Sequence, residues 1–119
     1  MQVPEDMLKT LTEIRDLLLK HDFPDQGSFV GRLVEMAEEG RDAFATEVTG
    51  GAMWGGAGAA WEVGTFKGHK IPDAEAGQDE AIFRKALIRL AEKMDEAGIG
   101  TPRSRDIAGI LRYWQEKGL

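Results

Sequence analysis

Residues 78–99 read QDEAIFRKALIRLAEKMDEAGI, and this stretch decides the fold class more clearly than any other part of the chain. Its principal apolar side chains recur at alternating steps of four and three residues, the spacing of one face of an α-helix: Phe83, Leu87, Leu90 and Met94. The stripe is widened by three more: Ile82, Ala86 and Ala91. Gly98 follows where a glycine commonly ends a helix, and Ile99 is placed for the contact that accompanies such a cap. We therefore predict a core-facing helix over residues 78–97.

Comparable stripes lie toward both ends of the chain. Residues 4–20 open with Pro4 and two acidic residues, which favour a helix N-terminus. Their apolar face is formed by Met7, Leu11, Ile14 and Leu18, widened by Leu8 and Leu17. Near the other end, Thr101 and Pro102 have the residue types of an N-cap and a first helical position. The helix predicted there turns inward Ile107, Ile110, Leu111 and Trp114.

The segments between these helices are predicted from their helix breakers. Pro24 and Gly27 indicate a loop over residues 22–27, after which Ser28 is expected to cap a helix that ends before Gly40. A short helix over residues 41–48 follows, with three inward side chains: Ala43, Phe44 and Val48. Residues 67–77 are expected to form an exposed loop. We predict one all-α domain over residues 1–119, a compact bundle of about five helices.

Residues 50–68 differ from the rest, reading GGAMWGGAGAAWEVGTFKG, with seven glycines in nineteen positions and two of the three tryptophans. Flexible glycine linkers carry serine instead of such large apolar side chains, so we expect this segment to be packed. Gly55 and Gly56 are expected to form a turn with positive φ or a close backbone approach. Residues 57–63 are predicted to form a helix of small residues.

Composition restricts the class of function. The formal net charge of −6 argues against general affinity for nucleic acid and suits a basic protein partner. No apolar run approaches the roughly 20 residues that span a bilayer, so no membrane partner is expected. The chain contains no cysteine, and its first residues lack the pattern of a signal peptide, so we expect a cytoplasmic protein. Its oligomeric state is left open.

The chemically reactive residues form no recognisable catalytic set. Two acidic pairs, Glu35 with Glu38 and Glu92 with Asp95, have the one-turn spacing by which all-α nucleotide pyrophosphohydrolases bind magnesium. No set of Lys and Asn residues that would bind a phosphate substrate accompanies these pairs. A metal-dependent nucleotide pyrophosphohydrolase is therefore kept only as the alternative interpretation. His21 is expected at a helix C-terminus and His69 in a loop. We expect no enzyme activity, no cofactor and no metal ion.

The run Met53-Trp54-Gly55-Gly56-Ala57-Gly58-Ala59-Ala60-Trp61-Glu62 resembles a signature of small helical bacterial proteins. That signature is an aromatic residue followed by Gly-Gly-x-Gly and a small residue, and some of its bearers are similar to immunity proteins of polymorphic toxin systems. The sequence departs from it at Ala59, where serine is usual. The resemblance implies a protein that neutralises a toxin by direct binding. The expected partner-binding residues are Trp54, Gly55, Gly56, Gly58, Trp61 and Glu62.

Overall fold

The protein is all-helical in the computed structural model, which describes residues 2–63, 66 and 70–119. Its elements are α1 (Glu5–Lys20), α2 (Pro24–Glu38), α3 (Ala43–Val48), α4 (Gly51–Trp54), α5 (Asp73–Glu96) and α6 (Pro102–Lys117). No strand occurs in the described residues, and α4 is a single turn of four residues. The radius of gyration, 13.6 Å, is that of a compact chain of this length. The predicted compact bundle of about five helices is confirmed.

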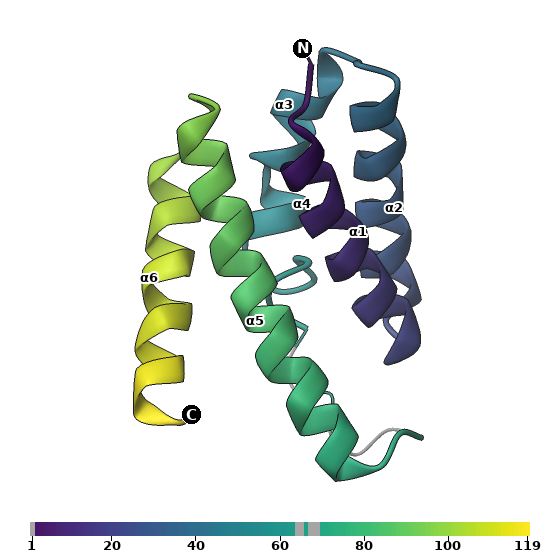
Figure 1. Ribbon diagram of the computed structural model, residues 1–119, viewed down its shortest axis with the longest axis vertical. Helices are drawn as coiled ribbons and strands as arrows, with labels where there is room; N and C mark the ends of the chain where they lie inside the picture. The colour runs from purple at the N-terminus through teal and green to yellow at the C-terminus, as the bar shows by residue number, and fades with distance from the viewer. Residues whose placement is uncertain (1, 64–65, 67–69) are drawn as a thin grey trace.

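Helix α1 occupies the middle of the bundle. It packs against α2 on one side and against α5 on the other (Figure 1). Helix α6 runs antiparallel to α5 and lies at the edge of the molecule, where its contacts within the bundle are with α5 and the short α4 (Figure 1). The long helix α5 therefore separates α6 from the pair formed by α1 and α2.

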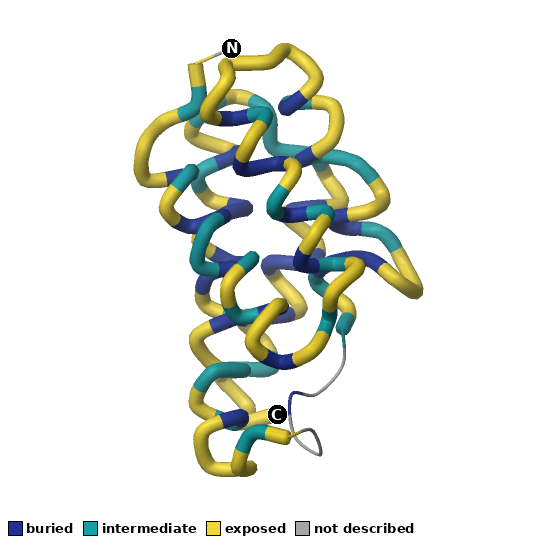
Figure 2. The backbone as a smooth tube through the Cα atoms, turned by 90° about the vertical axis from the view of Figure 1, so that its right-hand side faces the viewer, coloured by how far each residue is buried: buried dark blue, intermediate teal, exposed yellow. Residues whose placement is uncertain are grey.

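The predicted stripes on α1 and α5 form most of the core. The four principal residues of each stripe are almost fully buried, as are Phe44, Val48, Met53 and Trp54 from the connecting segments. Buried positions gather along the inner faces of the helices, and exposed positions follow the outside (Figure 2). Burial of apolar surface is the main favourable free energy of folding, so these stripes hold the helices together.

Two helices begin earlier than the sequence predicts. Helix α2 starts at Pro24, so the expected loop over residues 22–27 is wrong from Pro24 onward, and Ser28 lies inside the helix. Helix α5 starts at Asp73, which corrects the expected loop at residues 73–77. Proline is compatible with the first helical position, because the N–H there has no partner within the helix and the fixed φ of proline is already helical. Pro24 takes that position. Pro72 directly precedes α5, where it likewise breaks no helical bond.

Several side chains face differently from the prediction. Ala43, Ile82 and Ile110 were expected to turn inward, but all three are exposed. Each lies at the margin of an apolar stripe, where the angle at which the helix packs decides whether the side chain is covered. Residues 57–63 do not form the predicted helix; the helical turn is instead Gly51–Trp54.

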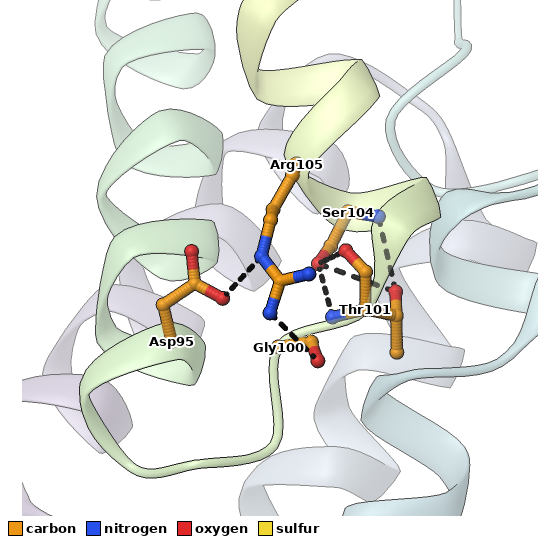
Figure 3. Close-up of polar contacts among 5 residues, drawn as sticks. All are labelled: Asp95, Gly100, Thr101, Ser104 and Arg105. Carbon is orange, nitrogen blue, oxygen red and sulfur yellow. Dashed lines mark hydrogen bonds and ion pairs between the residues drawn. The ribbon is translucent and has the colours of Figure 1, made fainter.

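The junction between α5 and α6 forms as predicted. Gly98 has a φ of +76°, and the backbone N–H of Ile99 bonds to the carbonyl of Met94. Thr101 caps α6 by accepting a hydrogen bond from the backbone N–H of Ser104, whose hydroxyl in turn accepts one from the backbone of Thr101 (Figure 3). Arg105 bridges the two helices through Asp95, with Nε 2.9 Å from Oδ1 (Figure 3). The antiparallel arrangement of α5 and α6 is thus fixed at this end.

Candidate functional site

The glycine-rich segment after α4 folds back onto that helix. The backbone N–H of Ala60 bonds to the carbonyl of Ala52 at 2.8 Å, and a turn closes from Ala59 to Gly56 at 3.0 Å. Gly58 supplies the positive φ of this turn, at +88°. A Cβ at Gly55 would lie 2.5 Å from the carbonyl oxygen of Gly51, so the close backbone approach expected there is confirmed.

Gly56 does not have the role that the sequence suggests. Its φ is not positive, and an added Cβ would meet no atom within 4 Å. It lies exposed in the bend, whereas Gly58 takes the left-handed conformation. The bend therefore needs glycine at positions 55 and 58, for different reasons, and does not need it at position 56.

The two tryptophans of this segment have different environments. Trp54 is fully buried, and its indole Nε1 donates to the carbonyl of Val48 at 2.8 Å. Trp61 is half-buried, and its Nε1 donates to the carbonyl of Gly55 at 2.7 Å. Arg103 from α6 donates to the carbonyls of both Trp54 and Gly55, at 2.7 and 3.3 Å. Trp54 thus anchors the segment to the core, and Trp61 is the tryptophan that reaches the surface.

Trp61 borders a pocket of about 310 Å³ between α5 and α6. Its ring faces that of Trp114 across 6.4 Å between centroids, with the ring planes tilted by 34°. The other residues that line the pocket are Phe83, Leu111, Glu62, Glu80 and Arg84. The volume is at the lower end of the range for small-ligand or side-chain pockets. The pocket thus has aromatic walls beside two carboxylates and one guanidinium, groups that can contact both apolar and charged side chains.

The charged residues of the pocket are held by contacts of their own. The guanidinium carbon of Arg84 lies 5.3 Å from the Trp114 ring centroid, and its Nη1 donates to the carbonyl of Leu119. Glu80 Oε1 accepts from the backbone N–H of Phe66 at 3.1 Å. Glu62 is exposed at the pocket. These contacts fix the position of Arg84 and Glu80, while the Glu62 side chain extends toward solvent.

No family model, curated protein or solved structure matches this chain. Within the described residues, no helix is long and apolar enough to cross a membrane. The resemblance to immunity-type proteins therefore stays a prediction.

The acidic pairs of the alternative interpretation remain apart. Glu35 and Glu38 are exposed on α2, whereas Glu92 and Asp95 lie on α5, and α1 packs between these two helices. The α5 pair contacts α6, with Glu92 near Arg112 at 3.7 Å and Asp95 near Arg105 at 2.9 Å. Across residues 2–63, 66 and 70–119, no three His, Asp or Glu side chains gather as metal ligands would. His69, expected in a loop, lies outside the described residues.

Of the residues predicted to bind a partner, Trp61 and Glu62 line the pocket, while Gly55 and Gly58 shape the bend behind it. The sequence alone does not indicate that α5 and α6 contribute to the pocket. The i, i+3 pairs Glu80–Phe83 and Leu111–Trp114 each mark one helix edge, but nothing local indicates that these two edges face each other. That juxtaposition depends on how α5 and α6 pack.

Proposed function

We propose that this protein acts by binding another protein through the Trp61–Trp114 pocket, as an immunity-type protein that neutralises a basic toxin. The observation that carries the proposal is the pair of indole rings bordering one surface pocket, beside the carboxylates Glu62 and Glu80. A few aromatic residues usually supply most of the binding free energy of a protein interface. Blocking a toxin requires a complementary surface and no catalytic residues.

The rigidity of the pocket supports this role. Trp61 is held by its 2.7 Å bond to the Gly55 carbonyl, and the Arg84 guanidinium lies against Trp114. Side chains that are fixed before association lose little conformational entropy when a partner binds. The two indoles therefore favour tight binding more than two mobile tryptophans would.

The charge of the pocket and of the whole chain favours a cationic partner. A Lys or Arg side chain entering beside Glu62 would meet a carboxylate and the face of Trp61 together, and both attract cations. The net charge of −6 accelerates encounter with a basic protein, and salt screens that attraction. We therefore expect association to slow as ionic strength rises.

The direct test is to capture the partner from a native lysate with the full chain and identify it. Its affinity is then measured at two salt concentrations, and its toxic activity with and without the protein. Trp61→Ala should weaken binding by roughly thirtyfold or more, the effect of losing about 2 kcal/mol at an interface hot spot. Glu62→Gln should mainly slow association, because it removes charge at the pocket without changing side-chain shape.

Matched controls separate binding from folding. Glu38→Gln changes charge equally on α2, far from the pocket in the bundle, and should leave the affinity at the wild-type value. Because Trp61→Ala also removes an internal hydrogen bond, its thermal unfolding is measured beside its affinity. A partner whose affinity is unaffected by both Trp61→Ala and Glu62→Gln would overturn the proposal.

A further inference from the structure

The outer face of α6 carries a regularly spaced strip of side chains, none of which lines the Trp61–Trp114 pocket. It consists of Asp106, Ile110, Tyr113 and Lys117, all exposed. Tyr113 is 55% exposed and Ile110 is 39% exposed, two of the five exposed large hydrophobic residues of the described chain. The buried side of the same helix is formed by Ser104, Ile107, Ala108 and Leu111. Helix α6 is thus apolar toward the bundle and partly apolar toward solvent.

The spacing of this strip is that of a helix–helix seam. Its residues follow one another at steps of four, three and four, the a and d positions of a heptad. Isolated exposed hydrophobic residues are ordinary on a protein surface. Here the two apolar residues, Ile110 and Tyr113, lie in the middle of the strip. The acidic Asp106 lies at one end and the basic Lys117 at the other. This order is the one that a self-complementary antiparallel pair requires.

An antiparallel pair of α6 helices is generated by a two-fold axis that is perpendicular to the helix and passes between Leu111 and Arg112. It places Ile110 level with Tyr113 of a second copy and Asp106 level with Lys117 of that copy. Because the arrangement is isologous, each of these pairs occurs twice. A parallel pairing would instead set Asp106 against Asp106 and Lys117 against Lys117, which repel.

The distribution of charge also favours this helix for self-association. Two copies of a chain with a net charge of −6 repel each other over most of their surface. The strip on α6 is instead neutral, with one acidic and one basic residue, and two basic residues beside it are paired within their own chain: Arg105 with Asp95 and Arg112 with Glu92. Its position at the edge of the bundle leaves its outer face accessible (Figure 1).

We propose that two copies of this protein associate through the outer faces of α6, packed antiparallel around a two-fold axis. The contact comprises one strip of each 16-residue helix, which is small beside the roughly 1,200 Å² or more of stable interfaces. The dimer is therefore weak and concentration-dependent. None of the four strip residues lines the Trp61–Trp114 pocket, so the dimer leaves the lining of that pocket to the partner.

Charge exchange between Asp106 and Lys117 tests both the surface and the register. Sedimentation is followed over a concentration series reaching about 1 mM for the wild type, Asp106→Lys, Lys117→Asp and the double variant. Each single substitution converts two attractive pairs into two repulsive ones and should weaken association about tenfold or more. The double variant restores opposite charges in both pairs and should recover most of the wild-type affinity.

Glu35→Lys is the matched control, because it changes the net charge as Asp106→Lys does but lies on α2, which α5 separates from α6. It should not weaken association. The substituted side chains are exposed, and circular dichroism checks that each variant retains its helices. A wild type that stays monomeric throughout the series, or single variants that associate as well as the wild type, would overturn the proposal. So would a double variant no better than either single one.

Discussion

The imidazole Nε2 of His21, at the end of α1, lies 2.8 Å from the carboxylate Oδ2 of Asp79 on α5. The histidine is at the helix C-terminus, as predicted, but its ring is fully buried and stacks on Phe66 at 4.2 Å between centroids. Lys20 contacts the same Asp79 oxygen at 2.7 Å. One carboxylate thus joins the end of α1 to α5 and is the partner of Nε2 of the buried histidine, whose Nδ1 has no hydrogen-bond partner among the described residues.

Replacing Asp79 with Ala should lower the free energy of unfolding by roughly 1–3 kcal/mol, because it leaves the buried His21 nitrogen without its acceptor. Urea denaturation at neutral pH measures the change. Glu75→Ala is the matched control, since Glu75 shares Lys20 but does not contact His21, and its exposed ion pair contributes about 0–1 kcal/mol. Equal losses for the two variants would show that the His21 contact contributes little.

Stability should fall in acid partly through Asp79. The hydrogen bond from Lys20, assisted by His21, holds the pKa of Asp79 below its ordinary value against the opposing effect of burial. The folded state then binds this proton less readily than the unfolded chain. The resulting stabilisation is complete above the unfolded value of about 4 and is lost as pH falls through the folded value.

Asp79→Asn should therefore flatten part of the decline in unfolding free energy below about pH 4. Urea denaturation at a series of pH values measures this directly. The salt-bridged Asp6 also has a lowered pKa, owing chiefly to its hydrogen bond from Lys93, so some decline should remain in the variant. An unaltered pH dependence in Asp79→Asn would contradict the assigned role of this carboxylate.

The three glycines of the bend should respond differently to alanine. Gly55→Ala forces a Cβ against the Gly51 carbonyl, 2.5 Å away, and should cost about 1–3 kcal/mol. Gly58→Ala should cost roughly 1 kcal/mol because φ is +88°. Gly56→Ala should be close to neutral. Thermal unfolding of the three variants ranks them, and a Gly56 variant as unstable as that of Gly55 would contradict the description of the bend.

Gly109→Ala should stabilise the protein by roughly 0.5–1 kcal/mol. Gly109 is exposed inside α6, where alanine has the higher helix propensity, and an added Cβ meets nothing within 4 Å. Gly98→Ala is the opposing case, since its φ of +76° makes alanine strained there. The melting temperature should thus rise for the first variant and fall for the second; a fall for both would argue against the described surface of α6.

The expectation that the purified protein hydrolyses nothing stays a prediction. Titration calorimetry with magnesium and manganese, followed by a screen for nucleotide hydrolysis, tests it. We expect no binding heat attributable to the acidic pairs, because Glu38 and Asp95 lie on helices separated by α1. Tight metal binding abolished by Glu38→Gln would favour the pyrophosphohydrolase interpretation instead.

Local sequence patterns predict α1, α2, α3, α5 and α6, but not the single turn α4, which lies at Gly51–Trp54 instead of within residues 57–63. The apolar periodicity of α1, α5 and α6 is a local property, and so are the caps at Gly98 and Thr101, which depend on residues a few positions apart. The starts of α2 and α5 were missed because Pro24 and Pro72 suggest breaks, although proline is compatible with the beginning of a helix. Local patterns thus indicate which segments are helical more reliably than where they start.

The tertiary structure alone decided which edges of those helices meet. The pocket joins Trp61 to Trp114, and the buried hydrogen bond joins His21 to Asp79, pairs separated by long stretches of chain. Such contacts depend on the angle and depth at which helices pack, and residue spacing along one helix carries no information about either. For the same reason Ile110, at the margin of its stripe, lies exposed although its spacing alone places it inside.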